Sequence, residues 1–416
     1  MNRNPPLSSA NGEQDRARTP AAVTSGNISD EIRDGEASVN GGDGSGYSSF
    51  SPSDPNELLL RQGPRHAPLT PLRIVRGLAC LLVLLSTAFF MLIFLAPFCC
   101  VLVRIFSRHH SRELVAFFFG HWLAMWPFLF ENINETRVVF SGDRVPGGER
   151  AIVICNHRTE VDWMYIWNLA LRKGRIGHVK YVVKNSVRDL PVFGWALYVM
   201  EFLLIERKWE VDEPLMERYL SSFKDARDPL WLILFPEGTD YTEQKKLAGQ
   251  ELAEKKGLRK LNHVLMPKTK GFQSCVKNLG SSLDAVYDLT IGYKNRCPLF
   301  IDNLFGIDPS EVHIHIRRIP VEQIPSDANG CSSWLYKAYE RKDELLSSFI
   351  KKGYFSPGGS IEDKLPTSKS LVNFTGVAAF TLVLGYLVAS CLWMKLYIGL
   401  SCLYFAIVSH FGWRSA

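Results

Sequence analysis

The chain has 416 residues, of which 46% are hydrophobic, and its formal net charge is +6 at pH 7. This composition excludes a soluble enzyme of average polarity and a polytopic transporter, and it favours one globular domain with a few membrane segments. The modest positive charge predicts contact with anionic lipid head groups and no nucleic-acid partner. The nine cysteines follow no disulfide or metal-ligand spacing, so the sequence predicts no metal site.

Residues 1–70 are rich in Ser, Gly, Pro, Asp and Asn and have almost no apolar periodicity. A segment of this composition cannot bury enough apolar surface to offset the entropy lost on ordering. The sequence therefore predicts a disordered tail, and its first residues lack the apolar core of a signal peptide.

Two apolar stretches follow, and we interpret residues 74–130 as N-terminal membrane-associated helices. Residues 77–103 are long enough to cross the roughly 30 Å hydrocarbon core of a bilayer, and Pro97 is expected to kink or end this helix. Residues 114–130 are rich in aromatic side chains, which is typical of a membrane interface. Arginines flank the first stretch on both sides, so their distribution gives no orientation.

A histidine and an aspartate follow the short apolar run of residues 151–154. Residues 155–162 read Cys-Asn-His-Arg-Thr-Glu-Val-Asp, which predicts a buried strand, a sharp exit at Asn156 and then a helix. On one continuous helix His157 and Asp162 would lie roughly 140° apart. They can meet if His157 lies in the turn and Asp162 on the helix.

Such a pair has a clear chemistry. The imidazole can take a proton from a hydroxyl, while the carboxylate fixes its tautomer and stabilises the imidazolium. The pair demands no Ser or Cys nucleophile, so the hydroxyl can belong to the substrate. An isolated pair with this spacing is more often a capping histidine and a surface aspartate.

A second buried strand, residues 230–234, ends in residues 235–239, which read Phe-Pro-Glu-Gly-Thr. The two blocks, in this order and spacing, resemble those of the glycerolipid acyltransferase family. The family's two other blocks resemble the apolar run that ends at Arg207 and the short predicted strand at residues 264–266 with the proline that follows it. The resemblance covers about residues 74–320.

The resemblance implies an α/β fold with a mixed sheet flanked by helices, N-terminal membrane helices and a C-terminal membrane anchor. The alternation of short apolar runs with helical or polar stretches between residues 137 and 320 indicates the same class. We assign residues 131–350 to the catalytic domain, 351–370 to a linker and 371–413 to the anchor. The anchor contains two apolar segments, which form either a hairpin or one span with an interfacial helix.

The resemblance also implies the site and its substrates. His157, oriented by Asp162, is the expected base, acyl-CoA is the co-substrate, no cofactor is needed, and a lysophospholipid is the acceptor. A guanidinium can clamp a phosphate, and a glycine lets the backbone approach a ligand closely. The residues expected to hold the acceptor are Arg207, Glu237, Gly238 and Thr239.

One residue departs from the family pattern. Members that act on lysophosphatidic acid commonly carry Arg after the Thr, whereas this chain has Asp240. A carboxylate there repels a phosphomonoester by about 1 kcal/mol near a surface, unless nearby basic residues compensate. The variant block resembles a branch that contains lysocardiolipin acyltransferases and plant-like lysophosphatidic acid acyltransferases.

The leading prediction is therefore acyl-CoA-dependent acylation of the sn-2 hydroxyl of lysophosphatidic acid, which gives phosphatidic acid. The close alternative is a lysocardiolipin or lysophosphatidylinositol acyltransferase. Two further alternatives are a CoA-independent transacylase and a non-enzymatic, membrane-anchored lipid-binding protein.

Membrane lipids are the remaining expected partners, and the chemistry restricts the topology. We expect an integral membrane protein of the endoplasmic reticulum. Because acyl-CoA is made in the cytosol, we expect its catalytic domain to face the cytosol. One crossing from a cytosolic tail would place the site in the lumen, and a spanning hairpin would place Arg104, Arg108 and Arg112 on the wrong side. Two re-entrant or in-plane helices avoid both problems, with full spanning as the alternative.

Overall fold

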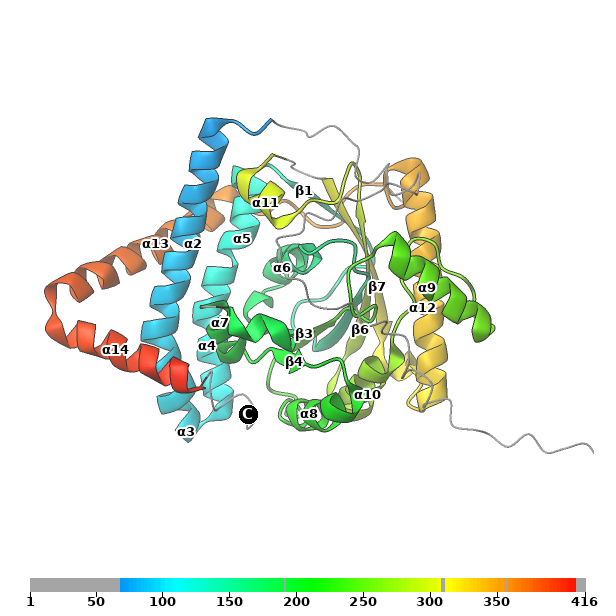
Figure 1. The fold of residues 1–416 in the computed structure, drawn as a ribbon, viewed down its shortest axis with the longest axis horizontal. Helices are drawn as coiled ribbons and strands as arrows, with labels where there is room; N and C mark the ends of the chain where they lie inside the picture. The colour runs from blue at the N-terminus through cyan, green and yellow to red at the C-terminus, as the bar shows by residue number, and fades with distance from the viewer. Residues whose placement is uncertain (1–67, 191, 308–310, 357, 409–416) are drawn as a thin grey trace, which may run out of the picture. The chain divides into compact units, whose positions relative to one another are not determined.

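The computed structural model describes residues 68–190, 192–307, 311–356 and 358–408, so the predicted tail, apart from residues 68–70, lies outside the described residues. Within them the centre is a seven-stranded mixed sheet of order β1-β7-β6-β2-β5-β3-β4 (Figure 1). The strands are β1 Arg137–Gly142, β2 Ala151–Cys155, β3 Val179–Lys184, β4 Leu203–Ile205, β5 Trp231–Leu234, β6 Ala285–Tyr293 and β7 Glu311–Pro320. The β6–β7 pair is antiparallel and all other neighbours are parallel.

Most of the predicted strands are confirmed, but the one at residues 264–266 is wrong. Val264 and Leu265 are buried, yet this segment is irregular. The amide of Leu265 donates to the carboxylate of Glu237 instead of to a neighbouring strand. Its apolar residues therefore indicated burial and not strand pairing.

Both faces of the central strands are covered, which explains why their sequences are apolar without alternation. In β2, Ala151 and Val153 pack on the side of α6 (Asp162–Arg172), whereas Ile152 and Ile154 pack on the opposite side. The helices of that opposite layer are α8 (Trp209–Ser221), α10 (Thr269–Leu279) and α12 (Ala328–Lys352). The helices α7 (Phe193–Val199), α9 (Glu243–Lys255) and α11 (Phe300–Phe305) also lie between the strands in sequence.

The first predicted membrane segment is a long helix that changes from α-helical to π-helical after Pro97. α2 (Pro71–Pro97) continues into the π-helical turn η1 (Phe98–Val103) and the short α3 (Arg104–Phe106). The chain then returns through α4 (Arg108–Leu123), α5 (Met125–Phe128) and η2 (Leu129–Ile133). Both Pro71–Phe106 and Arg108–Ile133 are long and apolar enough to cross a membrane.

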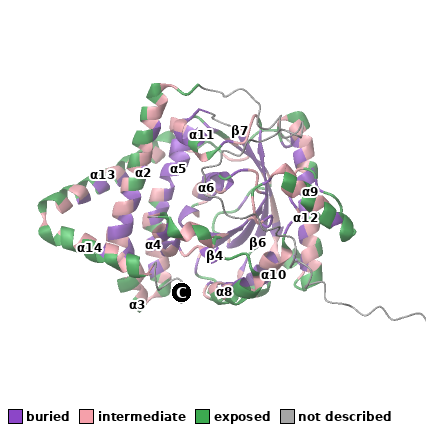
Figure 2. Cartoon of the chain, in the orientation of Figure 1, coloured by how far each residue is buried: buried purple, intermediate pink, exposed green. Residues whose placement is uncertain are grey.

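The two sides of α2 differ in what they contact. Leu84, Ala88 and Met91 are buried against the rest of the protein, whereas apolar side chains on the other side are exposed (Figure 2). The exposed ones are Leu72, Val75, Leu78, Leu82 and Leu85, which follow helical spacing. An exposed apolar stripe of this kind is typical of a surface that contacts lipid or another partner.

The predicted C-terminal anchor consists of two helices joined at Cys391, α13 (Thr367–Ser390) and α14 (Leu392–Ile407). They contact each other and α2, as in a hairpin, and within the described residues α13 is long and apolar enough to cross a membrane, whereas α14 is shorter. Most of their surface is exposed in Figure 2. Near the end of α14, Phe405 stacks on Trp195 of α7, with ring centroids 5.0 Å apart.

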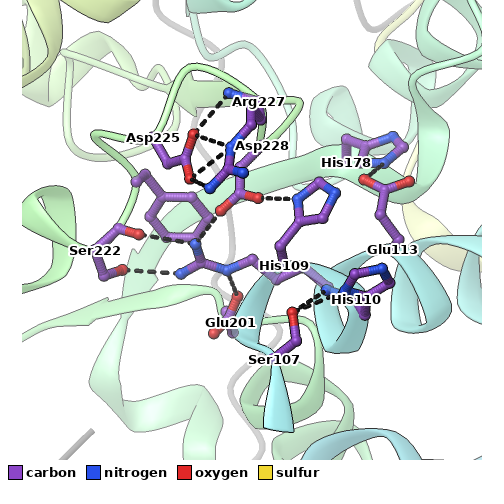
Figure 3. A network of polar contacts seen from close by, with 12 residues as sticks. Ser107, His109, His110, Glu113, His178, Glu201, Ser222, Asp225, Arg227 and Asp228 are labelled. Atoms are coloured by element: carbon purple, nitrogen blue, oxygen red, sulfur yellow. Dashed lines mark hydrogen bonds and ion pairs between the residues drawn. The ribbon is translucent and has the colours of Figure 1, made fainter. Parts of the chain in front are cut away.

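Ionic contacts fasten the N-terminal helices to the catalytic domain near Ser107, where the chain turns into α4. Arg112 donates to Glu201 at 2.8 Å and to Asp228 at 2.6 Å, and Arg104 pairs with Glu201 at 2.9 Å. Asp228 also contacts Nδ1 of His109 at 2.5 Å (Figure 3). These arginines, which the sequence placed after the apolar stretch, are thus partners of the catalytic domain.

The opposite end of α2 is fastened as well. Arg73 donates to the carbonyl of Gly306, at the end of α11, and Arg76 donates to Asn134 at 3.1 Å. Between these ends α4 packs closely on the catalytic domain, because a Cβ at Gly177 would clash with the carbonyl of Ala116. The N-terminal helices therefore lie along the catalytic domain.

Candidate active site

The predicted contact between His157 and Asp162 is confirmed. α6 begins at Asp162, and His157 lies in the loop between β2 and α6. Nδ1 of His157 is 2.8 Å from Oδ2 of Asp162. The carboxylate accepts from Nδ1–H, so Nε2 is the ring nitrogen left to accept a proton. The His157 side chain is 20% exposed and that of Asp162 is fully buried, so only the base remains accessible.

Asp162 is held in one orientation by four donors. Besides His157, its Oδ2 accepts the backbone amides of Arg158 at 2.5 Å and Thr159 at 3.0 Å. Its Oδ1 accepts the hydroxyl of Tyr293 at 2.5 Å. Tyr293, the last residue of β6, was not predicted as a site residue. Its only signal in the sequence is a hydroxyl at the end of a buried strand.

The environment raises the pKa of His157 above its usual value. Burial opposes protonation, but the hydrogen bond to Asp162 and its charge, followed by the charges of Glu237 and Asp240, favour the imidazolium more strongly. A base with a raised pKa accepts a proton more readily, which suits proton transfer near neutral pH.

Glu237 joins the two predicted blocks. Its Oε1 accepts the backbone amide of His157 at 3.0 Å, and its Oε2 accepts the amide of Leu265 at 3.2 Å. Burial raises the pKa of Glu237 to about 8, despite these hydrogen bonds and the nearby charges of His157 and Arg158. Contact of Glu237 with the acceptor stays a prediction, but the geometry gives it a structural role because both oxygens bridge loops.

The glycine turn after Glu237 is internally bonded. Gly238 has φ +73°, where glycine is favoured, and its amide donates to the carbonyl of Phe235 at 2.9 Å. This amide is therefore already used within the turn. The Thr239 hydroxyl accepts from Nζ of Lys245 at 2.7 Å.

Lys245 also neutralises Asp240. The two side chains lie 3.0 Å apart, and Thr239 donates to the same carboxylate at 3.0 Å. Burial disfavours the charged form of Asp240, but the hydrogen bond and charge of Lys245 outweigh it and lower the pKa of Asp240. The local charge is thus less negative than Asp240 alone suggests.

Arg207 is not bonded to this cluster in the described part of the chain. It is exposed and has φ +63°, and among the described residues its side chain has no hydrogen bond or ion pair. Its turn is held by Asp212, whose carboxylate accepts the amide of Glu206 at 2.8 Å. A guanidinium presented in this way can bind an anion. Binding of the acceptor phosphate by Arg207 stays a prediction.

Two further residues fix the loop around His157. Asn156 is fully buried, and its amide group exchanges hydrogen bonds with the backbone of Ile291 at 3.0 and 2.7 Å. Arg158 stacks on the ring of Tyr241 at 4.2 Å and donates to the carbonyl of His263 at 3.0 Å. Within the described part of the chain, no group of three or more His, Cys, Asp or Glu side chains could hold a metal ion.

Comparisons with known proteins identify the family of the chain. The family model described as Acyltransferase matches residues 137–294, and the one described as Acyltransferase C-terminus matches residues 302–377. The chain is 53% identical to the probable 1-acyl-sn-glycerol-3-phosphate acyltransferase 5 of Arabidopsis thaliana, covering 85% of this chain and 94% of that protein. It is 39% identical to lysocardiolipin acyltransferase 1 of Gallus gallus, covering 63% and 70%.

Among solved structures, the 1-acyl-sn-glycerophosphate acyltransferase of Thermotoga maritima is a distant likeness. Its identity is 17% and its TM-score 0.40, over 66% of this chain and 98% of that one. The family models and the curated relatives establish the assignment: the chain belongs to the glycerolipid acyltransferase family.

Proposed function

We propose that this protein transfers an acyl group from acyl-CoA to the sn-2 hydroxyl of lysophosphatidic acid and so forms phosphatidic acid. The observation that carries the proposal is the contact of 2.8 Å between His157 and Asp162, which provides a tautomer-fixed base. The name of the relative from Arabidopsis thaliana supports the choice of acceptor.

The reaction proceeds in one displacement. Nε2 of His157 accepts the proton of the acceptor hydroxyl, and the hydroxyl oxygen attacks the thioester carbonyl. The carbon–sulfur bond then breaks, and the imidazolium returns the proton to the CoA thiolate, so no acyl-enzyme forms. Asp162 stabilises the imidazolium between these steps. The exposed Arg207 is the expected ligand of the acceptor phosphate.

A second acceptor is favoured by Asp240 and by the lysocardiolipin acyltransferase relatives. A larger head group would not need an arginine at this turn. Because Lys245 neutralises Asp240, the phosphomonoester remains our first choice.

The test uses membranes that contain the wild-type chain or the variant His157→Ala. They receive labelled acyl-CoA and, separately, lysophosphatidic acid, lysophosphatidylinositol, lysocardiolipin or glycerol 3-phosphate. Product that depends on His157 and forms from lysophosphatidic acid supports the proposal, whereas preference for a larger head group supports the second acceptor. Product without acyl-CoA would indicate a transacylase, and equal results for both chains would refute the enzymatic function.

We further propose that the protein lies on the cytosolic leaflet of the endoplasmic reticulum, with α2 in the plane of the membrane or re-entrant. The continuous helical segment Pro71–Phe106, which contains α2, is bonded to the catalytic domain at both ends, so a perpendicular crossing would draw part of that domain into the bilayer. Cell fractionation with protease protection tests this proposal, because complete digestion of the catalytic domain in sealed microsomes is expected.

A further inference from the structure

We propose that three residues of helix α12, Tyr339, Lys342 and Asp343, are positioning residues for the loop that carries His157. Helix α12 is in this sense part of the catalytic apparatus. The inference rests on the proposed function and concerns the part of the chain after residue 302, which has its own family model. The three residues are spaced by three and four positions, so they lie on one face of the helix.

The first of them to consider is a buried lysine. Lys342 is 0% exposed, and its Nζ lies 2.5 Å from Oδ1 of Asp288 in β6. It also donates to the carbonyls of Leu289 in β6 and, at 3.4 Å, of Ile154 in β2. A buried ion pair is often no more stabilising than apolar side chains of the same volume. Stability alone is therefore a weak reason for a lysine here, whereas an ammonium that joins two strands near the site explains it.

Tyr339 extends this contact to the residue next to the catalytic loop. Its hydroxyl donates to the carbonyl of Cys155 at 3.0 Å. Cys155 ends β2 and precedes Asn156, whose side chain is itself bonded to Ile291 of β6. The peptide that leads into His157 is thus fixed by α12 on one side and by β6 on the other.

Asp343 supports the loop from a second direction. Its Oδ1 accepts the backbone amides of Asn262 at 2.8 Å and of His263 at 2.6 Å. The same segment provides the carbonyl that binds Arg158 and the Leu265 amide that binds Glu237. Glu237 in turn accepts the amide of His157 at 3.0 Å.

Two independent chains of contacts therefore run from one helix face to the backbone of His157. A shift of α12 would move the end of β2 and the segment 262–265 together, and the imidazole would lose its alignment with Asp162 and the acceptor hydroxyl. Misplacement by about 1 Å can cost about 100-fold in rate. The consequence is a defect in catalysis with little effect on substrate binding.

The experiment uses the full chain in detergent micelles. Lys342→Met removes the ammonium but leaves the buried Asp288 with only Arg317, at 3.8 Å, as an ionic partner, so Lys342→Met/Asp288→Asn is the main variant. Lys337→Met is the matched control, because Lys337 lies on the same helix and is exposed. Tyr339→Phe removes a single hydroxyl and serves as the second, milder variant.

Three quantities are measured for each variant: the unfolding temperature, kcat with the KM of each substrate, and the pH dependence of His157 modification by diethyl pyrocarbonate, followed by mass spectrometry. For the double variant we expect an unfolding temperature close to that of the wild type, a kcat lower by roughly 10- to 100-fold, and KM values within about two-fold. The apparent pKa of His157 should fall because its contact with Asp162 loosens.

A double variant that is folded with wild-type kcat and an unchanged His157 titration overturns the proposal. If the double variant does not fold, Tyr339→Phe decides: an unchanged kcat and His157 titration overturn it, and a lowered kcat with unchanged KM supports it. The His157 titration needs no turnover, so it separates failure of this proposal from failure of the proposed function.

Discussion

Replacing Glu237 with glutamine tests the bridge between the two sequence blocks. Glutamine keeps the shape and can still accept the amide of His157. Its Nε2 would then face the amide of Leu265, so two donors would meet in a buried site. Leaving a buried donor unsatisfied costs about 1–3 kcal/mol of unfolding free energy.

The ionisation of Glu237 makes the free energy of unfolding depend on pH. Its pKa is about 8 in the folded protein, against 4.5 for a glutamate in the unfolded chain. Between these values the folded state holds more protons, so the free energy of unfolding falls as pH rises. At 1.36 kcal/mol per pKa unit, the full shift corresponds to about 5 kcal/mol, lost progressively between about pH 4.5 and pH 8. Glutamine does not titrate, so the variant lacks this dependence.

The measurement is denaturant unfolding of both chains in the same detergent from about pH 5 to about pH 9. We expect the variant to be less stable than the wild type at about pH 5, and we expect the difference to shrink and then reverse as the pH rises toward about 8. Subtracting the curves removes the groups common to both chains. Parallel curves across this range would refute the argument that Glu237 is buried with a raised pKa.

Three other substitutions test the base and the docking of the helices. Asp162→Asn should lower kcat by roughly 100- to 10,000-fold and lower the pKa of His157, so a small kinetic effect would contradict the assigned base. Asp240→Asn removes a charge that raises the pKa of His157, so the acid limb of kcat/KM against pH should move to lower pH; a shift to higher pH would contradict this sign. Arg112→Met should lower the free energy of unfolding by up to about 3–5 kcal/mol, because Asp228 and Glu201 lose the guanidinium that joins them and keep only His109 and Arg104 as ionic partners. The control Arg104→Met breaks a more exposed pair and should cost under about 1 kcal/mol, so equal effects would argue against the network.

Local sequence patterns were sufficient to predict the contact between His157 and Asp162 at the centre of the site. His157 and Asp162 are close in sequence, and the strand, turn and helix that bring them together follow from apolar and capping patterns within a dozen residues. The buried strands could be predicted for the same reason, since each is a short apolar run. Pro97 was also informative, because α2 ends there.

Contacts between distant residues could not be predicted in this way. Tyr339 and Cys155 are separated by 184 positions, and nothing in either segment specifies the other. A signal existed, because Lys342 interrupts the apolar face formed by Leu335, Ala338 and Leu346. A lysine on such a face indicates a buried partner without identifying it. The error at residues 264–266 likewise hid the amide that Glu237 binds.

The attachment of the helical segment Pro71–Phe106 to the catalytic domain at both ends has a consequence for where the product goes. A helix bonded to the catalytic domain near Arg73 and near Arg104 cannot tilt independently of the active site. On the proposed topology, the distance of His157 from the bilayer surface is then set by the protein, and the enzyme draws its acceptor from a single leaflet. The newly acylated lipid returns to that leaflet. Lipid asymmetry would therefore arise at synthesis, and equalising the two leaflets would require a separate protein that moves lipids across the bilayer.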